Sequence, residues 1–228
     1  HVRSRRQRQM CIRDRVEQCG NGARCFVKFV YNKGLTEKKR IRAKTMKGVI
    51  ELELKEDGMV RVSMGTPSFE PSSLPFNPQG LPSREIRGFK QWAVRYKGEL
   101  VWFSVCSMGN PHVTIVTDDI ESAPVKELGP FIENHPAFPR RVNVGFIQPI
   151  TEHEANVRVW ERGAGETLAC GTGNCAAAAT SIELGVLSSP ILTHNRGGDL
   201  RLAWEGEGED VELFGPAVTV FDSEIEVP

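Results

Sequence analysis

Apolar and polar residues alternate over many short stretches of this chain, as they do in half-buried β-strands. Residues 49–54 and 59–64 alternate in this way, and the polar Lys55-Glu56-Asp57-Gly58 between them predicts the turn of a hairpin. Similar stretches predict further strands at 92–96, 100–106, 112–117, 142–147, 155–160, 200–204 and 218–221.

Three stretches are instead typical of helices. Residues 22–32 and 173–184 are each followed closely by a glycine, a frequent helix stop, and residues 123–134 form an amphipathic segment that ends before Pro136. Many short strands around few helices predict an α+β fold. Residues 65–88 contain five prolines and little periodicity, so we expect a linker or long loop there, with a domain boundary near its start.

The charges are unevenly distributed although the net charge is zero. Residues 1–15 hold six arginines and one acidic residue, so the rest of the chain is net acidic and has no general attraction for nucleic acid. An arginine-rich start could be a nucleic-acid arm or a transit peptide, but it lacks an apolar face, and we interpret residues 1–15 as a non-native or disordered end. No apolar run is long enough for a membrane span.

The cysteines predict free thiols. A chain of 228 residues with no secretory signal does not need a disulfide framework, so a reduced, cytoplasmic setting is expected. We interpret Cys25, Cys106 and Cys175 as packed core residues. The spacings between the cysteines and the scattered histidines argue against a metal site.

One tetrad occurs twice. Cys19-Gly20-Asn21-Gly22 and Cys170-Gly171-Thr172-Gly173 each stand directly before a predicted helix, which indicates two equivalent halves. A helix N-terminus carries unpaired N–H groups and a partial positive charge, which lower the pKa of a thiol and attract a carboxylate. Two such corners facing each other would hold one carboxylate between two sulfurs.

That geometry suits inversion of the carbon beside a carboxylate. One face of the carbon must lose a proton while the other face receives one, and a thiolate base with a thiol acid performs both steps. The helix-end N–H groups would stabilise the charge that develops on the carboxylate. A glycine-rich turn before a helix also occurs at phosphate sites, but no P-loop Lys-Ser/Thr follows either tetrad.

At this point the residues resemble a known family. Residues 18–25 and 161–173 resemble the two cysteine motifs of diaminopimelate epimerases, and residues 108–112 and 141–146 resemble substrate-binding segments of that family, in the same order. The resemblance runs from about Val16 to the C-terminus. It implies an isomerase that interconverts LL- and meso-diaminopimelate in lysine and peptidoglycan-precursor biosynthesis, with no pyridoxal phosphate, metal or other cofactor.

The resemblance also implies a role for each matching residue. Cys19 and Cys170 would be the catalytic acid/base pair. The N–H groups of the two helix starts would hold the carboxylate at the reacting carbon, namely those of Gly20, Asn21, Gly171 and Thr172. The distal end of the substrate would be bound by Asn110, Asn143, Arg162 and, through an amino group, Glu161. His112 and Glu161 are candidates for tuning the pKa values of the cysteines.

The family fold implies two pseudo-symmetric domains, each a curled, mostly antiparallel sheet around a central helix. Residues 16–65, completed by 216–228, would form the N-terminal domain, and residues 66–215 the C-terminal domain. Upstream of Val16 the sequence departs from the family pattern. We therefore expect an incomplete first domain and a chain that alone is poorly stable and weakly active or inactive.

Other interpretations stay open at this stage. A proline-racemase-like enzyme or another amino-acid racemase of the superfamily is one, although the polar grip favours a substrate with a second charged end. A non-catalytic metal or nucleic-acid binding protein that uses its cysteines is another. For the epimerase we expect a small-molecule substrate and no nucleic-acid or membrane partner, and a homodimer is a possible assembly.

Overall fold

The structure is a computed structural model, and it describes residues 20–45 and 48–224. The predicted non-native start at 1–15 and the predicted catalytic Cys19 lie outside these residues. The helices are α2 (Gly20–Asn32), α3 (Val125–Glu133), α4 (Gly171–Glu183) and the single 3-10 turn η1 (Pro71–Ser73). The strands are β1 (Arg40–Thr45), β2 (Gly48–Leu54), β3 (Val60–Ser63), β4 (Ser83–Ile86), β5 (Phe89–Tyr96), β6 (Glu99–Ser107), β7 (Pro111–Val116), β8 (Asn143–Thr151), β9 (Glu154–Glu161), β10 (Gly165–Thr167), β11 (Ile191–Asn195), β12 (Gly198–Ala203) and β13 (Glu212–Gly215).

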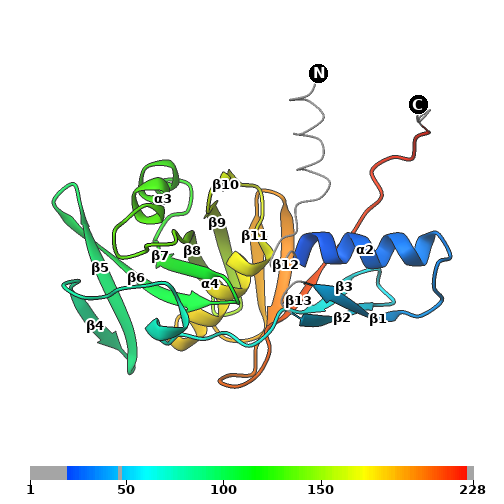
Figure 1. The fold of residues 1–228 in the computed structure, drawn as a ribbon, viewed down its shortest axis with the longest axis horizontal. Coiled ribbons are helices and arrows are strands. Elements are labelled where there is room, and N and C mark those ends of the chain that lie inside the picture. Colours follow the sequence, from blue (N-terminus) through cyan, green and yellow to red (C-terminus); the bar gives the residue numbers. More distant parts are fainter. Residues whose placement is uncertain (1–19, 46–47, 225–228) are drawn as a thin grey trace.

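One large sheet runs through the molecule, in the order β1-β2-β3-β13-β12-β11-β9-β8-β7-β6-β5-β4, with β10 paired to β9 (Figure 1). Most neighbours are antiparallel, and the pairs β7–β8 and β11–β9 are parallel. The α+β fold class expected from the sequence is therefore confirmed. Because β3 pairs with β13, the sheet continues across the predicted boundary at residues 65–66, and the division into two domains stays a prediction.

Helix α4 lies inside the larger part of the molecule, in contact with β6, β7, β8, β9 and β12. Residues 171–181 are all buried, including the run Ala176–Ala179. Alanine has a strong helix propensity and a small side chain, so the strands approach the helix on every side. The alanine run therefore explains how one short helix can be enclosed by a sheet.

Helix α2 is the counterpart of α4 and packs on β2 and β3, but it is less enclosed (Figure 1). Its buried residues include Val27, whereas Phe26 and Phe29 are 48% and 56% exposed. Cys25 is also exposed, so the prediction of a packed core cysteine is wrong at this position, while Cys106 and Cys175 are buried as expected. The helix period puts Cys25 on the outer side of α2, away from Val27 and the sheet.

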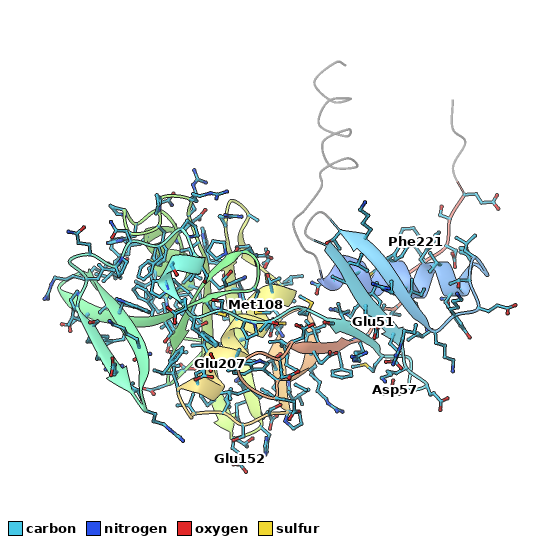
Figure 2. All side chains as sticks on the ribbon, turned by 60° about the horizontal axis from the view of Figure 1, so that its bottom comes forward. Glu51, Asp57, Met108, Glu152, Glu207 and Phe221 are labelled. Carbon is cyan, nitrogen blue, oxygen red and sulfur yellow. The ribbon has the colours of Figure 1, made fainter. Side chains whose placement is uncertain are left out.

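A second core lies between the sheet and α3, where Leu128 and Ile132 pack with Phe146. Gly129 allows α3 to approach β9, because a Cβ at this position would lie 2.5 Å from the ring of Trp160. Met108, labelled in Figure 2 between the two ends of the molecule, belongs instead to the core around α4, which also includes Cys170 and Ala176–Ala179.

Most predicted elements are present, including the hairpin of β2 and β3 and all three helices. The strand predicted at 218–221 is wrong: these residues form no strand and are exposed, and β13 at 212–215 pairs with β3 instead. The segment after β13 runs beside α2, where Arg24 donates to the Pro216 carbonyl at 3.3 Å and Lys33 pairs with Asp222. None of the described helices is long and apolar enough to cross a membrane.

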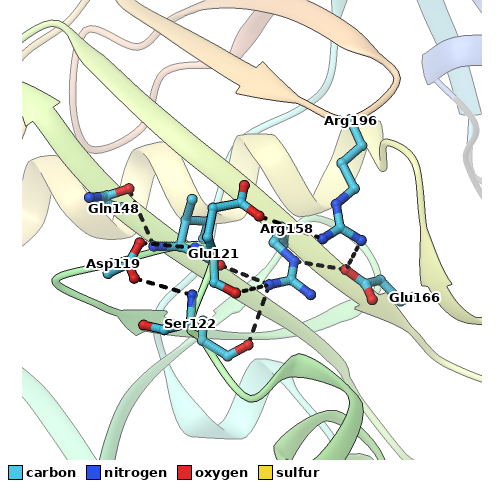
Figure 3. Close-up of polar contacts among 9 residues, drawn as sticks. Asp119, Glu121, Ser122, Gln148, Arg158, Glu166 and Arg196 are labelled. Atoms are coloured by element: carbon cyan, nitrogen blue, oxygen red, sulfur yellow. Dashed lines mark hydrogen bonds and ion pairs between the residues drawn. The ribbon is translucent and has the colours of Figure 1, made fainter.

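A buried ion pair joins β9 to β10. Arg158 Nε donates to Glu166 Oε1 at 2.8 Å, and both side chains are 9% exposed (Figure 3). The same guanidinium donates to the carbonyls of Ile120 and Glu121, and Arg196 also donates to Glu166 at 3.0 Å. Burial alone would raise the pKa of Glu166, but the Arg158 hydrogen bond and the charges of Arg158 and Arg196 lower it.

We expect Glu166→Gln to lower the free energy of unfolding by about 3 kcal/mol at pH 7, because it leaves a buried guanidinium without its counter-charge. Since the pKa of Glu166 is lowered in the folded protein, its contribution is present above the ordinary value of 4.5 and is lost as the pH falls below it. Urea unfolding of both proteins at pH 7 and near pH 3 measures this, with the exposed Glu121→Gln as the control. An equal difference at both pH values would contradict the ion-pair explanation.

Candidate active site

The N-termini of α2 and α4 meet at their first residues. A Cβ added to Gly171 would lie 3.5 Å from Gly20 Cα, and one added to Gly20 would lie 3.9 Å from Gly171 Cα. Both positions are glycine in the repeated tetrad, and a Cβ at either would be in van der Waals contact with the backbone of the other helix end. The structure thus brings together the residues that directly follow the two predicted catalytic cysteines.

Asn21 ties the two helix starts to each other. Its Nδ2 donates to the Ala169 carbonyl at 3.3 Å, directly before Cys170, and its Oδ1 accepts from Arg24 Nη1 at 3.1 Å. The sequence predicted only the backbone N–H of Asn21 as a site group. Its side chain has the additional task of joining the halves of the repeat.

Cys170 is the N-cap of α4 and is 7% exposed. Burial first, and then the charge of the neighbouring Glu161 carboxylate, raise the pKa of its thiol to about 12, against the lowering by Thr172 and the Gly173 N–H. The sequence predicted a lowered pKa from the helix end. That prediction is wrong for this structure, because desolvation and a nearby negative charge outweigh the helix N-terminus.

A chain of hydrogen bonds leads from His112 to Cys170. His112 Nε2 lies 3.0 Å from Asn110 Oδ1, Asn110 Nδ2 donates to Thr172 Oγ1 at 3.3 Å, and Thr172 Oγ1 lies 3.6 Å from Cys170 Sγ. Because the amide oxygen only accepts, His112 carries its proton on Nε2, and the Thr172 hydroxyl hydrogen is left for the sulfur. Burial, aided by the charge of Arg162, lowers the pKa of His112 to about 3, so the ring is neutral.

Asn143 is buried at the start of β8 and bonds to two other site segments. Its Nδ2 donates to the Pro111 carbonyl at 3.1 Å, and its Oδ1 accepts the Arg162 backbone N–H at 2.9 Å. Arg162 in turn donates from its guanidinium to the Arg140 carbonyl at 3.3 Å. Asn143 therefore fixes the segments around Asn110 and Arg162 relative to each other.

Glu161 ends β9 beside Cys170. Thr167 of β10 donates its hydroxyl to Glu161 Oε1 at 2.6 Å, which fixes the carboxylate next to the sulfur. Thr167 was not among the predicted site residues, although it lies within the second cysteine motif. A hydroxyl at a strand position opposite β9 was the available signal.

Asn174 is another residue that the sequence analysis did not single out. Its Nδ2 donates to the Cys170 carbonyl at 2.8 Å and to Asn195 Oδ1 at 2.9 Å, so it fixes the backbone of the cysteine from inside α4. Its place four residues after Cys170 puts it one helical turn further along. Asn195, however, comes from β11, and no local pattern pointed to it.

A pocket of about 610 Å³ opens elsewhere, between residues 69–81 and strands β4 and β5, and its lining includes Phe69 and Trp92. None of its lining residues belongs to the predicted site. Within residues 20–45 and 48–224, no three His, Cys, Asp or Glu side chains converge as metal ligands would. The candidate site is therefore placed by its thiol, amide and carboxylate groups at the junction of α2 and α4, and not by a pocket or a metal cluster.

Comparison with known proteins adds a family match. The family model for diaminopimelate epimerase matches residues 13–70 and 104–220. A protein of Cupriavidus pinatubonensis named diaminopimelate epimerase is 52% identical over 212 residues, which is 93% of this chain and 74% of the relative. One of Herminiimonas arsenicoxydans with the same name is 54% identical over 212 residues, 93% of this chain and 75% of the relative.

Solved structures share the fold at low identity. A hydroxyproline epimerase from Agrobacterium vitis superposes with a TM-score of 0.63 at 15% identity, over 88% of this chain and 65% of that one. A PhzF-family phenazine biosynthesis protein of Bacillus anthracis gives 0.60 at 15% identity, over 93% of this chain and 77% of that one. These likenesses support the fold alone.

We expect His112 and His194 to titrate differently. His112 should stay neutral from about pH 5 upwards because burial lowers its pKa, whereas hydrogen bonds to Glu154 and Asp199 raise the pKa of His194 above 6.5. Below about pH 6.5, His112 is protonated in the unfolded chain but stays neutral in the folded protein. It therefore lowers the free energy of unfolding as the pH falls below that value. The Cε1–H shifts in a ¹H NMR titration measure both; a His112 midpoint near 6.5 would contradict the buried, neutral ring.

The surroundings of Cys170 predict opposite effects for two substitutions. Thr172→Val removes the hydroxyl that lowers the pKa of Cys170, so alkylation by iodoacetamide should slow. Glu161→Gln removes the charge that raises this pKa, so alkylation should accelerate, by about tenfold for each pKa unit. Peptide mass spectrometry gives the rate for Cys170, with exposed Cys25 as the internal reference. Changes of the same sign in both variants would refute this assignment of the two neighbours.

Proposed function

The chain belongs to the diaminopimelate epimerase family, and from that membership we propose that it interconverts LL- and meso-diaminopimelate by proton transfer between Cys19 and Cys170. The observation that carries the proposal is the approach of Gly20 to Gly171 at the N-termini of α2 and α4. Because each glycine directly follows one of the cysteines in the sequence, both sulfurs are assigned to one junction.

The carboxylate beside the reacting carbon would lie where the two helix N-termini converge. The N–H groups of Gly20 and Asn21 from α2 and of Gly171 and Thr172 from α4 are its proposed donors. Two partial positive charges then act on one carboxylate, and their effect strengthens as the electron pair of the broken C–H bond moves into it. The helix ends thus favour the transition state over the bound substrate.

The thiols move the protons. For one hand of substrate, the Cys19 thiolate takes the α-proton while the Cys170 thiol gives its own proton to the opposite face of the carbon. The stereocentre is inverted, Cys19 leaves as the thiol and Cys170 as the thiolate, and the opposite substrate hand reverses every step. The raised pKa of Cys170 supports the thiol as its resting form.

Glu161 and Thr172 suit the two forms of Cys170. The thiol form donates to the Glu161 carboxylate, and the thiolate form accepts from the Thr172 hydroxyl, which is oriented by Asn110. Each state of the sulfur then has a partner of the matching kind, so neither is left buried and unpaired. His112, held neutral, orients Asn110 and adds no charge.

The residues that bind the distal end of the substrate would select diaminopimelate. We assign Arg162 to its carboxylate, since a guanidinium binds a carboxylate in a planar fork, and Glu161 and Asn110 to its amino group. Asn143 has one N–H and one lone pair beyond its two backbone bonds, so it can contact this end as well as position Arg162. A proline-racemase-like activity is disfavoured, because the relatives near 50% identity are named diaminopimelate epimerases.

We further propose that the enzyme acts in the cytoplasm on this small-molecule substrate, without a nucleic-acid partner. The four cysteines of the described residues are free thiols, as a reducing compartment maintains them. Independence from cofactors and a homodimeric state stay predictions.

Incubation with LL-diaminopimelate in deuterated water tests the mechanism. The protein used has the part upstream of Val16 restored to the family pattern, because the chain alone is expected to be weakly active or inactive. Deuterium should enter at one α-carbon as the meso form appears, and Cys170→Ala and Cys19→Ala should each lower turnover by about 10²-fold or more. Proton NMR follows the exchange, and chiral chromatography follows the stereochemistry.

Cys25→Ser is the matched control, because Cys25 belongs to the same first motif but points outward from α2. It should keep the activity of the unchanged chain. Epimerisation that persists in Cys170→Ala would exclude the two-thiol mechanism, and activity on proline but not on diaminopimelate would exclude the substrate.

A further inference from the structure

The last residue of α3, Glu133, is a buried carboxylate that the mechanism above does not use. Its residue is 5% exposed, although carboxylates are rarely buried unless they are well paired. It faces the end of β9 and the turn that follows, on the outer side of the candidate site. The cost of burying this carboxylate must be offset by the groups that bind it.

Both oxygens of Glu133 are used. Trp160 Nε1 donates to Oε2 at 2.7 Å, and the Gly163 backbone N–H donates to Oε1 at 2.9 Å. The exposed Arg141 guanidinium adds an ion pair at 3.7 Å. The two short bonds are charge-assisted, which makes them stronger and more directional than bonds between neutral groups.

The positions of these donors along the chain are informative. Trp160 directly precedes Glu161, and Gly163 directly follows Arg162, so the carboxylate holds both ends of the two-residue segment that carries two proposed site residues. Gly163 has a φ of +77°, a backbone conformation that bends the chain sharply here. From the opposite side Asn143 accepts the Arg162 N–H at 2.9 Å.

We propose that Glu133 is a positioning residue for the epimerase, which fixes the turn 161–163 and thereby aims Arg162 and Glu161 at the distal end of the substrate. This inference rests on the proposed function. Glu133 touches neither substrate nor sulfur and acts only through the turn. Arg162 binds the end of the substrate remote from the reacting carbon, whereas Glu161, which also contacts Cys170, is held separately by the Thr167 hydroxyl at 2.6 Å. Loosening the turn therefore weakens binding more than proton transfer.

The main test is Glu133→Gln in the protein with its N-terminal part restored. Glutamine fills the same space but offers one acceptor and one donor, so either Trp160 or Gly163 then faces an N–H group instead of an oxygen. We expect KM for LL-diaminopimelate to rise about tenfold or more, since small displacements of binding groups are costly, while kcat changes by less than about threefold. Glu127→Gln is the matched control: the same substitution on an exposed position of α3 should leave KM unchanged.

A second variant separates positioning from loss of stability. Trp160→Phe removes the indole donor but leaves the Gly163 bond to Glu133. It should lower the thermal midpoint and raise KM less than Glu133→Gln does, because one of the two bonds to the segment is kept. If KM rises in Trp160→Phe as much as in Glu133→Gln, KM follows stability and the positioning role is refuted.

Amide hydrogen exchange of Gly163 supplies a readout that needs no activity. The Gly163 N–H should exchange slowly in the unchanged chain and about tenfold faster or more in Glu133→Gln. This measurement can be made even if the variant is too unstable for enzyme kinetics. Equal exchange in both proteins would overturn the inference. A protein with its N-terminal part restored that fails to epimerise refutes the proposed function alone, whereas an active restored protein with unaltered KM in Glu133→Gln refutes the positioning role alone.

Discussion

Two helix ends of the same polarity touch each other at Gly20 and Gly171, and the rest of the structure is arranged around that contact. Facing N-termini repel each other electrostatically unless an anion lies between them. The large sheet overcomes this repulsion by enclosing α4 and supporting α2, and Asn21 joins the two ends by a hydrogen bond to Ala169. The fold therefore maintains the junction at which we propose that the substrate carboxylate binds.

The sulfur of Cys170 illustrates how burial changes the effect of a helix end. An exposed thiol at an N-terminus would be readily deprotonated, but Cys170 is enclosed and has Glu161 beside it. In the proposed mechanism, the thiol keeps its proton until charge develops elsewhere in the site. An acid and base that exchange roles need such mutual dependence, since the loss of a proton at one thiol must accompany its gain at the other.

The supports of the site come from outside it. The ion pair of Arg158 and Glu166 fixes β10, which carries Thr167 and hence the orientation of Glu161. Glu133 fixes the far side of the same segment from α3. Both are buried charges in strands or at a helix end, where the backbone is already restrained. Such placement fixes the site more tightly than a loop would allow.

The amino-acid sequence alone determined the repeat of two cysteine tetrads, the hairpin of β2 and β3, the three helices and the family, because these depend on local spacing and on motifs of adjacent residues. The proposed site residues come from the same motifs, and their roles stay predictions. Only the tertiary structure decided that Cys25 is exposed, that 212–215 rather than 218–221 is a strand, that the pKa of Cys170 is raised, and that Glu133 holds the turn after β9. Burial and electrostatic environment are sums over neighbours that come from distant parts of the chain, and no local pattern contains them.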